Sequence, residues 1–183
     1  KFLGLEIKGN SKTKATQSLL LSPKVHLTCR NGLRLSSHSS LTVAGGTVST
    51  RRWLDVSPKA TLQGIGSIVG TVYNNGSVMV TGGGESSLRV DGDYHQSAKA
   101  MLNLKIVESE KGAINVEGTA HLAGKLALTI RNGFKPAARE SFTVLTARRI
   151  RGTFANPDDT VTAADGSRFS IEYSGSAVIL TLK

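Results

Sequence analysis

The chain has 183 residues, with 20 Gly, 4 Pro, one Trp, three Tyr, five Phe and a single Cys, and its 23 Lys and Arg against 13 Asp and Glu give a formal charge of +10. The unpaired Cys29 excludes an internal disulfide and a cysteine-based metal site, and no run approaches the ~18 apolar residues that span a bilayer. A hydrophobic content of 39% is too high for a disordered chain, so we expect a soluble, folded protein.

After about residue 20, apolar residues alternate with small or polar ones at a period of two, and no stretch has the three-and-four spacing of a helix. Turn-forming pairs such as Asn31-Gly32, Asn75-Gly76 and Asp165-Gly166 stand between the alternating runs. Short strands joined by tight turns predict an all-β chain, either a sandwich or a solenoid. The alternating apolar positions are, in chain order, Leu33/Leu35, Leu41/Val43, Leu88/Val90, Leu102/Leu104/Ile106, Leu126/Leu128/Ile130, Phe142/Val144, Phe169/Ile171/Tyr173 and Val178/Leu180/Leu182.

The first half of the chain favours the solenoid. Segments rich in small residues follow one another at residues 40–48, 53–56 and 60–64, and their spacing suggests stacked coils. In a β-solenoid each coil adds one strand to each of several parallel sheets, with aliphatic residues inside and Gly, Ser, Thr and Asn at the corners. Such a narrow core needs few aromatic residues, whereas a sandwich more often places a large aromatic at its centre. The scarcity of Trp and Phe before residue 134 therefore agrees with a solenoid.

The closing part of the chain, residues 134–183, holds four of the five Phe and ends in strands that are typical of hairpins. A solenoid ends in open sheet edges and an open apolar core, which promote aggregation unless they are covered. Large aromatic side chains supply the buried area that narrow coils lack. We therefore predict that this part caps the core with Phe134, Phe142, Phe154, Phe169 and Tyr173.

A series of short motifs runs through residues 54–106: a coil that ends in a Gly-x-Gly step, an Asn-Asn-Gly turn, a Gly-Asp-Tyr-x-Gln strand and a Leu-x-Leu strand. Further pieces follow in residues 114–126 and 132–154. In this order the motifs resemble the passenger β-helix of bacterial autotransporters, and the same module is similar to segments of other large secreted bacterial proteins. The resemblance covers roughly residues 40–183. The chain departs from the family in its basic charge and at residues 82–86, where a Pro-Gly-Asn-Ser turn is common.

The resemblance implies a right-handed parallel β-helix with a C-terminal β-hairpin cap, in one continuous domain. Coils are expected over residues 1–107, and C-terminal coils and capping hairpins over residues 108–183. An antiparallel β-sandwich is the competing fold. The resemblance also implies a secreted or surface-displayed bacterial protein in which the β-helix is a structural stalk or adhesin and not an enzyme. The start at Lys1, without an initiator Met or an apolar signal core, suggests a fragment of a longer protein.

Basic residues and the single Trp are the candidates for binding a partner. Guanidinium groups match carboxylate and sulfate groups, and an exposed indole offers a platform to a sugar ring. The expected partner is an acidic polysaccharide or another polyanion; the alternatives are a neutral glycan stacked on the Trp, or a basic surface that serves solubility alone. No recognition helix, zinc finger or basic strand interleaved with aromatics points to nucleic acid. The candidate binding residues are Arg51, Arg52, Trp53, Lys59, Arg148, Arg149 and Arg151.

Enzymatic chemistry has weaker support in the sequence. Glycan cleavage uses paired carboxylates, but turn formation or solvent exposure already explains the three close acidic pairs. The histidines never fall at a metal-ligand spacing. We therefore predict no catalytic residue, metal or cofactor, and keep as the alternative function a carbohydrate-binding module of, or part of, a glycan-active enzyme. The acidic pairs are Asp91/Asp93, Glu108/Glu110 and Asp158/Asp159, and the histidines are His26, His38, His95 and His121.

Overall fold

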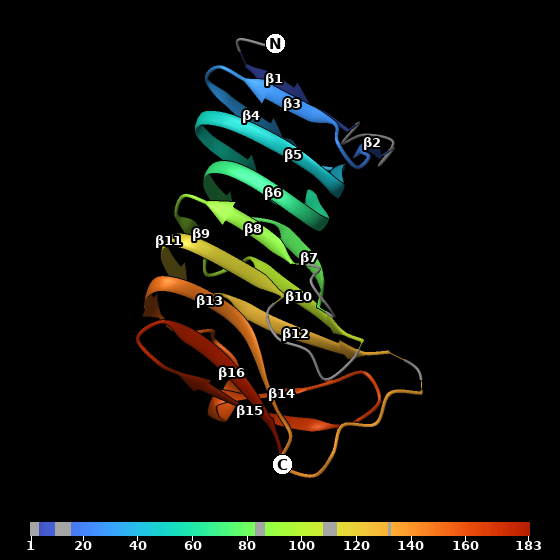
Figure 1. Cartoon of the computed structure of the whole chain (residues 1–183), viewed down its shortest axis with the longest axis vertical. Coiled ribbons are helices and arrows are strands. Elements are labelled where there is room, and N and C mark those ends of the chain that lie inside the picture. Colours follow the sequence, from blue (N-terminus) through green and yellow to red (C-terminus); the bar gives the residue numbers. More distant parts are fainter. Residues whose placement is uncertain (1–3, 10–15, 83–86, 108–112, 132) are drawn as a thin grey trace.

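The computed structural model describes residues 4–9, 16–82, 87–107, 113–131 and 133–183, and it is built almost wholly from β-strands. The strands wind into a β-solenoid of about five turns, stacked along the long axis of the molecule (Figure 1). The all-β prediction is confirmed, and parallel pairing between successive coils rules out the antiparallel sandwich. The elements are β1 (Leu5–Ile7), β2 (Gln17–Leu21), β3 (His26–Cys29), β4 (Gly32–Leu35), β5 (Ser39–Val56), β6 (Thr61–Asn74), β7 (Ser77–Gly82), β8 (Leu88–Asp91), β9 (Tyr94–Gln96), β10 (Met101–Ile106), β11 (Ile114–Leu122), β12 (Lys125–Ile130), β13 (Ser141–Gly152), the 3-10 turn η1 (Pro157–Asp159), β14 (Thr160–Thr162), β15 (Arg168–Tyr173) and β16 (Ala177–Leu182).

The coils form three parallel sheets. Sheet 1 contains β2, β7, β10, β12 and the first parts of β5 and β6. Sheet 2 contains β3, β8, the middle parts of β5 and β6, and parts of β11 and β13. Sheet 3 contains β1, β4, β9 and the last parts of β5, β6, β11 and β13. Because parallel strands lie about 4.8 Å apart, a residue in one coil faces its register partner in the next.

The core is a narrow column of aliphatic side chains. Leu33, Leu54 and Val72, which are register partners in sheet 3, are all fully buried. The apolar residues predicted to alternate are buried throughout the coils, so the period of two is confirmed as the inward-facing pattern. Cys29 also points into this core, where burial raises the pKa of its thiol, and it forms no disulfide.

Polar side chains point into the core at the corner that follows sheet 3; Asn was expected at the corners, but the inward positions were expected to be aliphatic. Asn74 is fully buried, and its amide nitrogen Nδ2 donates to the hydroxyl of Tyr94 at 3.1 Å and to the carbonyl oxygen of Met101 at 3.1 Å. Tyr94 donates in turn to Oε1 of Gln96 at 2.8 Å, and Gln96 Nε2 donates to the carbonyl oxygen of Ala123 at 2.8 Å. Burial raises the pKa of Tyr94 far above its usual range, so this hydroxyl remains a donor. The network links three successive coils through their corner backbone.

A Gly-x-Gly step turns β6 from sheet 1 into sheet 2. Gly64 and Gly66 have φ angles of +113° and +136°, a region that other residues rarely adopt. A Cβ atom added to Gly64 would lie 2.0 Å from the carbonyl oxygen of Val43 in the preceding coil. Glycine therefore allows the corner to pack directly against the coil before it.

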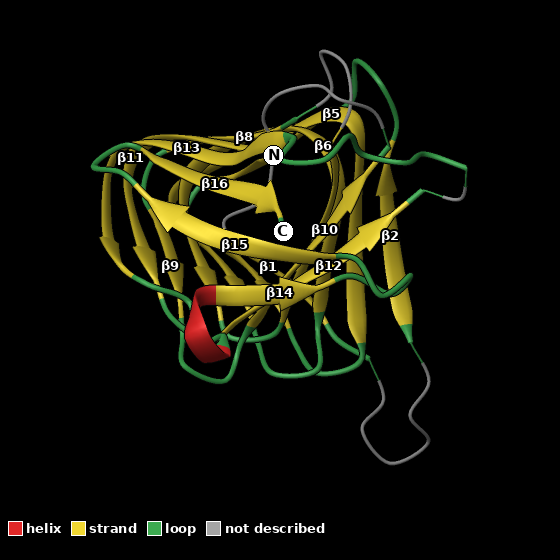
Figure 2. Cartoon of the chain, turned by 90° about the horizontal axis from the view of Figure 1, so that it is seen from below, coloured by secondary structure: helices red, strands yellow, loops and turns green. Residues whose placement is uncertain are grey.

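Antiparallel strands close the C-terminal end of the solenoid. Strand β13 is parallel to β11 on one side and antiparallel to β16 on the other, and β15 and β14 continue the antiparallel order. Figure 2 shows β14, β15 and β16 lying across this end of the coils. The change from parallel to antiparallel pairing thus occurs at β13, within residues 108–183.

Aromatic side chains fill the space beneath this cap, as predicted. Phe142 lies edge-on to Phe169, with 6.1 Å between ring centroids, and edge-on to Phe134, at 6.3 Å. The hydroxyl of Tyr173 accepts a hydrogen bond from the backbone N–H of Phe154 at 3.0 Å. Phe142, Phe154 and Phe169 are buried, so the cap has the large apolar core that the coils lack.

Candidate functional site

The outer face of sheet 3 carries a row of charged and aromatic side chains. From β4 to β11 their neighbours on either side in each strand are buried, so alternation directs these residues to the outside. Each is the register partner of the next, and we call the set the outer row. Its members are Glu6, Arg34, Asp55, Tyr73, His95, His121 and Arg151.

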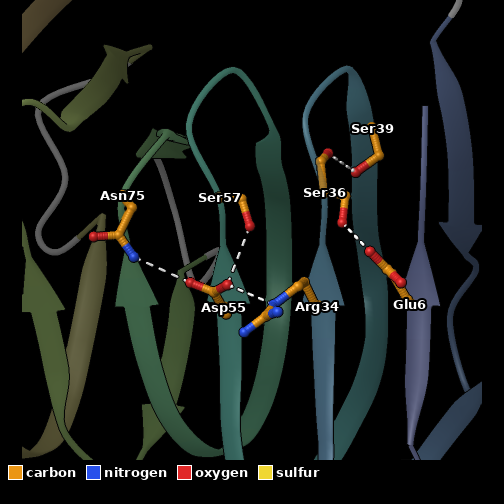
Figure 3. Close-up of polar contacts among 7 residues, drawn as sticks. All are labelled: Glu6, Arg34, Ser36, Ser39, Asp55, Ser57 and Asn75. Carbon is orange, nitrogen blue, oxygen red and sulfur yellow. Dashed lines mark hydrogen bonds and ion pairs between the residues drawn. The ribbon is translucent and has the colours of Figure 1, made fainter. Parts of the chain in front are cut away.

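The N-terminal half of the outer row is an ordered ion-pair network (Figure 3). Nε of Arg34 donates to Oδ2 of Asp55 at 3.0 Å. The same carboxylate accepts from the hydroxyl of Ser57 at 3.1 Å and from the amide of Asn75 at 3.1 Å. Because three donors from three coils surround Asp55, its carboxylate and the Arg34 guanidinium are held in one arrangement.

Trp53 lies beside this network, at the strand position two residues before Asp55. Its indole lies over the backbone of Gly32, where an added Cβ atom would approach Cδ2 of the ring to 2.7 Å. The guanidinium carbon of Arg34 is 5.4 Å from the ring centroid. Trp53 is half-buried and lines an open hollow of about 390 Å³ with Glu6, Asn31, Gly32 and Arg34 among the other lining residues.

The C-terminal half of the outer row is a stack of rings. The rings of Tyr73 and His95 are 4.9 Å apart at an interplanar angle of 17°, and those of His95 and His121 are 4.4 Å apart at 8°. Burial and the neighbouring His121 lower the pKa of His95, while Asp93 acts in the opposite direction. Sequence spacing did not reveal this pair, because the separation of 26 positions between His95 and His121 is one coil and not a local motif.

Acidification is expected to destabilise the protein through this stack. The folded-state pKa of His95 lies below its unfolded value of about 6.5, so the unfolded chain takes up a proton first. The stabilisation is therefore present above about pH 6.5 and is lost as the pH falls towards the folded pKa. We expect the Tm, followed by circular dichroism, to drop by a few degrees between about pH 7.5 and about pH 5.

His121→Asn should reduce this pH dependence, because it removes the neighbouring ring that helps to lower the pKa of His95. His26→Asn is the matched control, since His26 is exposed on β3 away from the outer row. An equal drop of Tm in the wild type and in both variants would contradict the assignment to the stack.

The basic residues predicted to bind do not form one cluster. Arg51 and Arg52 are exposed at the corner of β5 that precedes Trp53, whereas Lys59 lies in the turn beyond the other end of that strand. The Arg148, Arg149 and Arg151 group lies on β13, and the coils of β6, β8, β9 and β11 separate it from β5. Arg151 alone of the seven predicted residues belongs to the outer row, next to His121. The row itself was not predicted.

The acidic residues weighed as catalytic groups lie at strand ends and turns where they are described, with Asp91 exposed at the end of β8. Asp93 accepts the backbone N–H of Thr119 at 2.7 Å, and Asp158 and Asp159 form η1 with positive φ angles. Glu108 and Glu110 lie outside the described residues. Among the described residues no group of three or more His, Cys, Asp or Glu is arranged to hold a metal ion.

Comparison with protein-family models, with curated proteins and with solved structures returned no match. No helix in the described ranges is long and apolar enough to cross a membrane. What the chain does must therefore be inferred from its own residues and their arrangement.

Proposed function

We propose that the chain is a segment of a secreted or surface-displayed bacterial β-helix protein, and that it acts as a structural stalk or adhesin and not as an enzyme. The observation that carries the proposal is the continuous stacking of coils: three parallel sheets enclose one aliphatic column, and hairpins close its C-terminal end. Such a solenoid is quasi-one-dimensional and can hold groups at a set distance from a surface. The motif order resembling autotransporter passengers supports export.

A structural role is also supported by the partners of two carboxylates in and beside sheet 3, those of Asp55 and Asp93. Asp55 is engaged by three donors and Asp93 by a backbone N–H group. A general acid or base has to face a substrate with a free carboxyl group. These carboxylates instead connect one coil to the next.

Surface display is tested by labelling intact bacterial cells that produce the full-length parent protein with an antibody against the 183-residue chain. We expect labelling of intact cells, and its loss after brief protease treatment of those cells. Labelling that requires cell lysis would contradict the proposal. Deletion of the coils from the parent should then abolish attachment if the segment is an adhesin, or shorten the displayed structure if it is a stalk.

A second candidate function is binding of an anionic polysaccharide, as a module of, or part of, a glycan-active enzyme. Its support is the net charge of +10 together with exposed arginines at the same solenoid corner in β5 and β13. The two arginine groups are separated by the coils of β6, β8, β9 and β11, so an extended anionic polymer would contact them at two separate points. An enzyme would shorten the polymer, whereas a binding module would leave its length unchanged.

Replacing Arg51 and Arg52 together by Ala is expected to lower the NaCl concentration that elutes the protein from immobilised polygalacturonate. The Tm should fall by no more than a degree or two, because exposed charges contribute roughly 0 to 1 kcal/mol per pair to folding. Lys99→Ala with Lys105→Ala is the matched control, since it removes the same charge from exposed positions elsewhere. An equal effect of the two double variants would show that net charge alone controls retention.

A further inference from the structure

The hollow beside Trp53 combines an aromatic surface with free polar groups. The terminal nitrogens of Arg34 make no hydrogen bond to the described residues, since the contact with Asp55 uses Nε. Oε1 of Glu6 accepts from the hydroxyl of Ser36, and its second oxygen has no partner within the described part of the chain. Donors and an acceptor therefore surround the indole without being consumed by the fold.

We propose that this hollow binds one ring of a neutral pyranose glycan. The C–H groups on one side of a pyranose form an apolar face that packs on an indole, while the hydroxyl groups at its rim need donors and acceptors. Arg34 supplies donors, Glu6 an acceptor and the side-chain amide of Asn31 both. The volume of about 390 Å³ lies at the small end of the range of ligand sites, roughly 300 to 1,000 Å³.

The charges around the hollow favour a neutral ligand. A cationic ligand would meet the Arg34 guanidinium, which already lies 5.4 Å from the indole centroid. An anionic ligand would meet the carboxylate of Glu6 and, behind Arg34, that of Asp55. Glu6 and Arg34 are the two charged residues that line the first hollow, so their charges balance there. The site therefore differs in specificity from the basic corner at Arg51 and Arg52.

The site is held in place before a ligand arrives. Ser57 and Asn75 fix Asp55, which fixes Arg34, and Ser36 donates to Glu6. Side chains that are already ordered lose little entropy on binding. The sugar would therefore contact the rigid aromatic side chain of Trp53 and two polar side chains, Arg34 and Glu6, that are already held in place.

A second hollow, of about 380 Å³, continues from the first along the same face. It shares Glu6 and Arg34 with the first, and Lys8, Ser36 and Ser57 are among its other lining residues. Its lining is polar and offers hydroxyl groups rather than a ring. A second sugar unit fits there, so the site should prefer an oligosaccharide to a monosaccharide.

The test is a fluorescence titration, because Trp53 is the single Trp of the chain and its emission reports directly on the hollow. The probes are cellohexaose, maltohexaose and chitohexaose, with glucose for comparison. We expect at least one hexasaccharide to change the emission with a dissociation constant on the order of 0.1 to 1 mM, as suits one platform with a few hydrogen bonds. The affinity should change less than twofold between about 50 and about 500 mM NaCl, because no net charge is neutralised.

Three variants test the geometry by calorimetry. Trp53→Ala should weaken binding at least tenfold, and Trp53→Phe should restore part of the loss. Gly32→Ala keeps the indole but places a methyl group against it, and should weaken binding about tenfold by displacing the platform. Met79→Ala, an exposed apolar residue on sheet 1, is the control and should bind as the wild type does. Unchanged circular dichroism shows that each variant is folded.

Three outcomes would overturn the proposal: no emission change with any neutral hexasaccharide at about 10 mM, binding that Trp53→Ala leaves intact, or preference for oligogalacturonate with steep loss in salt. None of them bears on surface display, which the cell-labelling experiment tests separately.

Discussion

Asn74→Ala is expected to lower the free energy of unfolding by about 3 kcal/mol or more. Asn74 is fully buried at a corner of the core, where its Nδ2 group donates to Tyr94 and Met101 and its Oδ1 atom accepts the backbone N–H of Gly76 at 3.1 Å. Alanine would remove the donor to the carbonyl oxygen of Met101 and the acceptor for the N–H of Gly76, and it would open a cavity at a fully buried position. Urea unfolding followed by circular dichroism measures the change.

Asn103→Ala is the matched control for this prediction. Asn103 is half-buried on the outer face of sheet 1, where its amide donates to the hydroxyl of Ser77 at 2.8 Å. Water can replace that partner, so the cost should be about 1 kcal/mol or less. Tyr94→Phe should fall between the two, because it keeps the ring and removes one hydroxyl. Equal losses for Asn74→Ala and Asn103→Ala would show that the corner network contributes nothing special to stability.

Phe169→Ala is expected to cost about 3 to 5 kcal/mol, the range for removing a buried Phe side chain. Phe169 is fully buried in β15, between the antiparallel cap and the last coil, and it packs edge-on against Phe142. Its loss would loosen the strands that cover the end of the core and expose sheet edges able to pair with other molecules. Thermal unfolding should show the lower Tm, and size-exclusion chromatography with light scattering should show new oligomers.

Phe134→Ala provides the comparison, because this ring also touches Phe142 but is only half-buried at the rim of the cap. We expect a cost of about 1 to 2 kcal/mol from the smaller buried area, and a monomer on chromatography. If Phe134→Ala destabilised and oligomerised the chain as strongly as Phe169→Ala, the cap would not depend on the buried position of Phe169.

The two glycan proposals make opposite predictions about salt. Binding at Arg51 and Arg52 is electrostatic and should weaken steeply as NaCl rises, whereas stacking on Trp53 in a charge-balanced hollow should not. The sites adjoin on β5, so an extended polymer with both charged and neutral units could contact both. Measuring the Arg51 and Arg52 double variant and the Trp53→Ala variant against both an anionic and a neutral polymer separates the electrostatic contribution from the stacking contribution.

The sequence alone determined the class of fold and the direction of most side chains. Residues such as Leu33, Leu102 and Phe169 are buried where the period of two placed them, because alternation is a local property of an extended backbone. The cap was also predictable, since an open solenoid end requires large apolar side chains and the Phe residues are concentrated in residues 134–183.

Only the tertiary structure decided which side chains meet across coils. Partners in the outer row are separated by one coil, and the coil length varies from 18 residues between Asp55 and Tyr73 to 30 between His121 and Arg151. No fixed spacing in the sequence can therefore pair His95 with His121. The same irregularity hid the hollow at Trp53, which needs Gly32 one coil away to leave room for the ring. Register between coils is set by corner geometry and by packing of the whole column, and these are long-range properties that a local pattern does not contain.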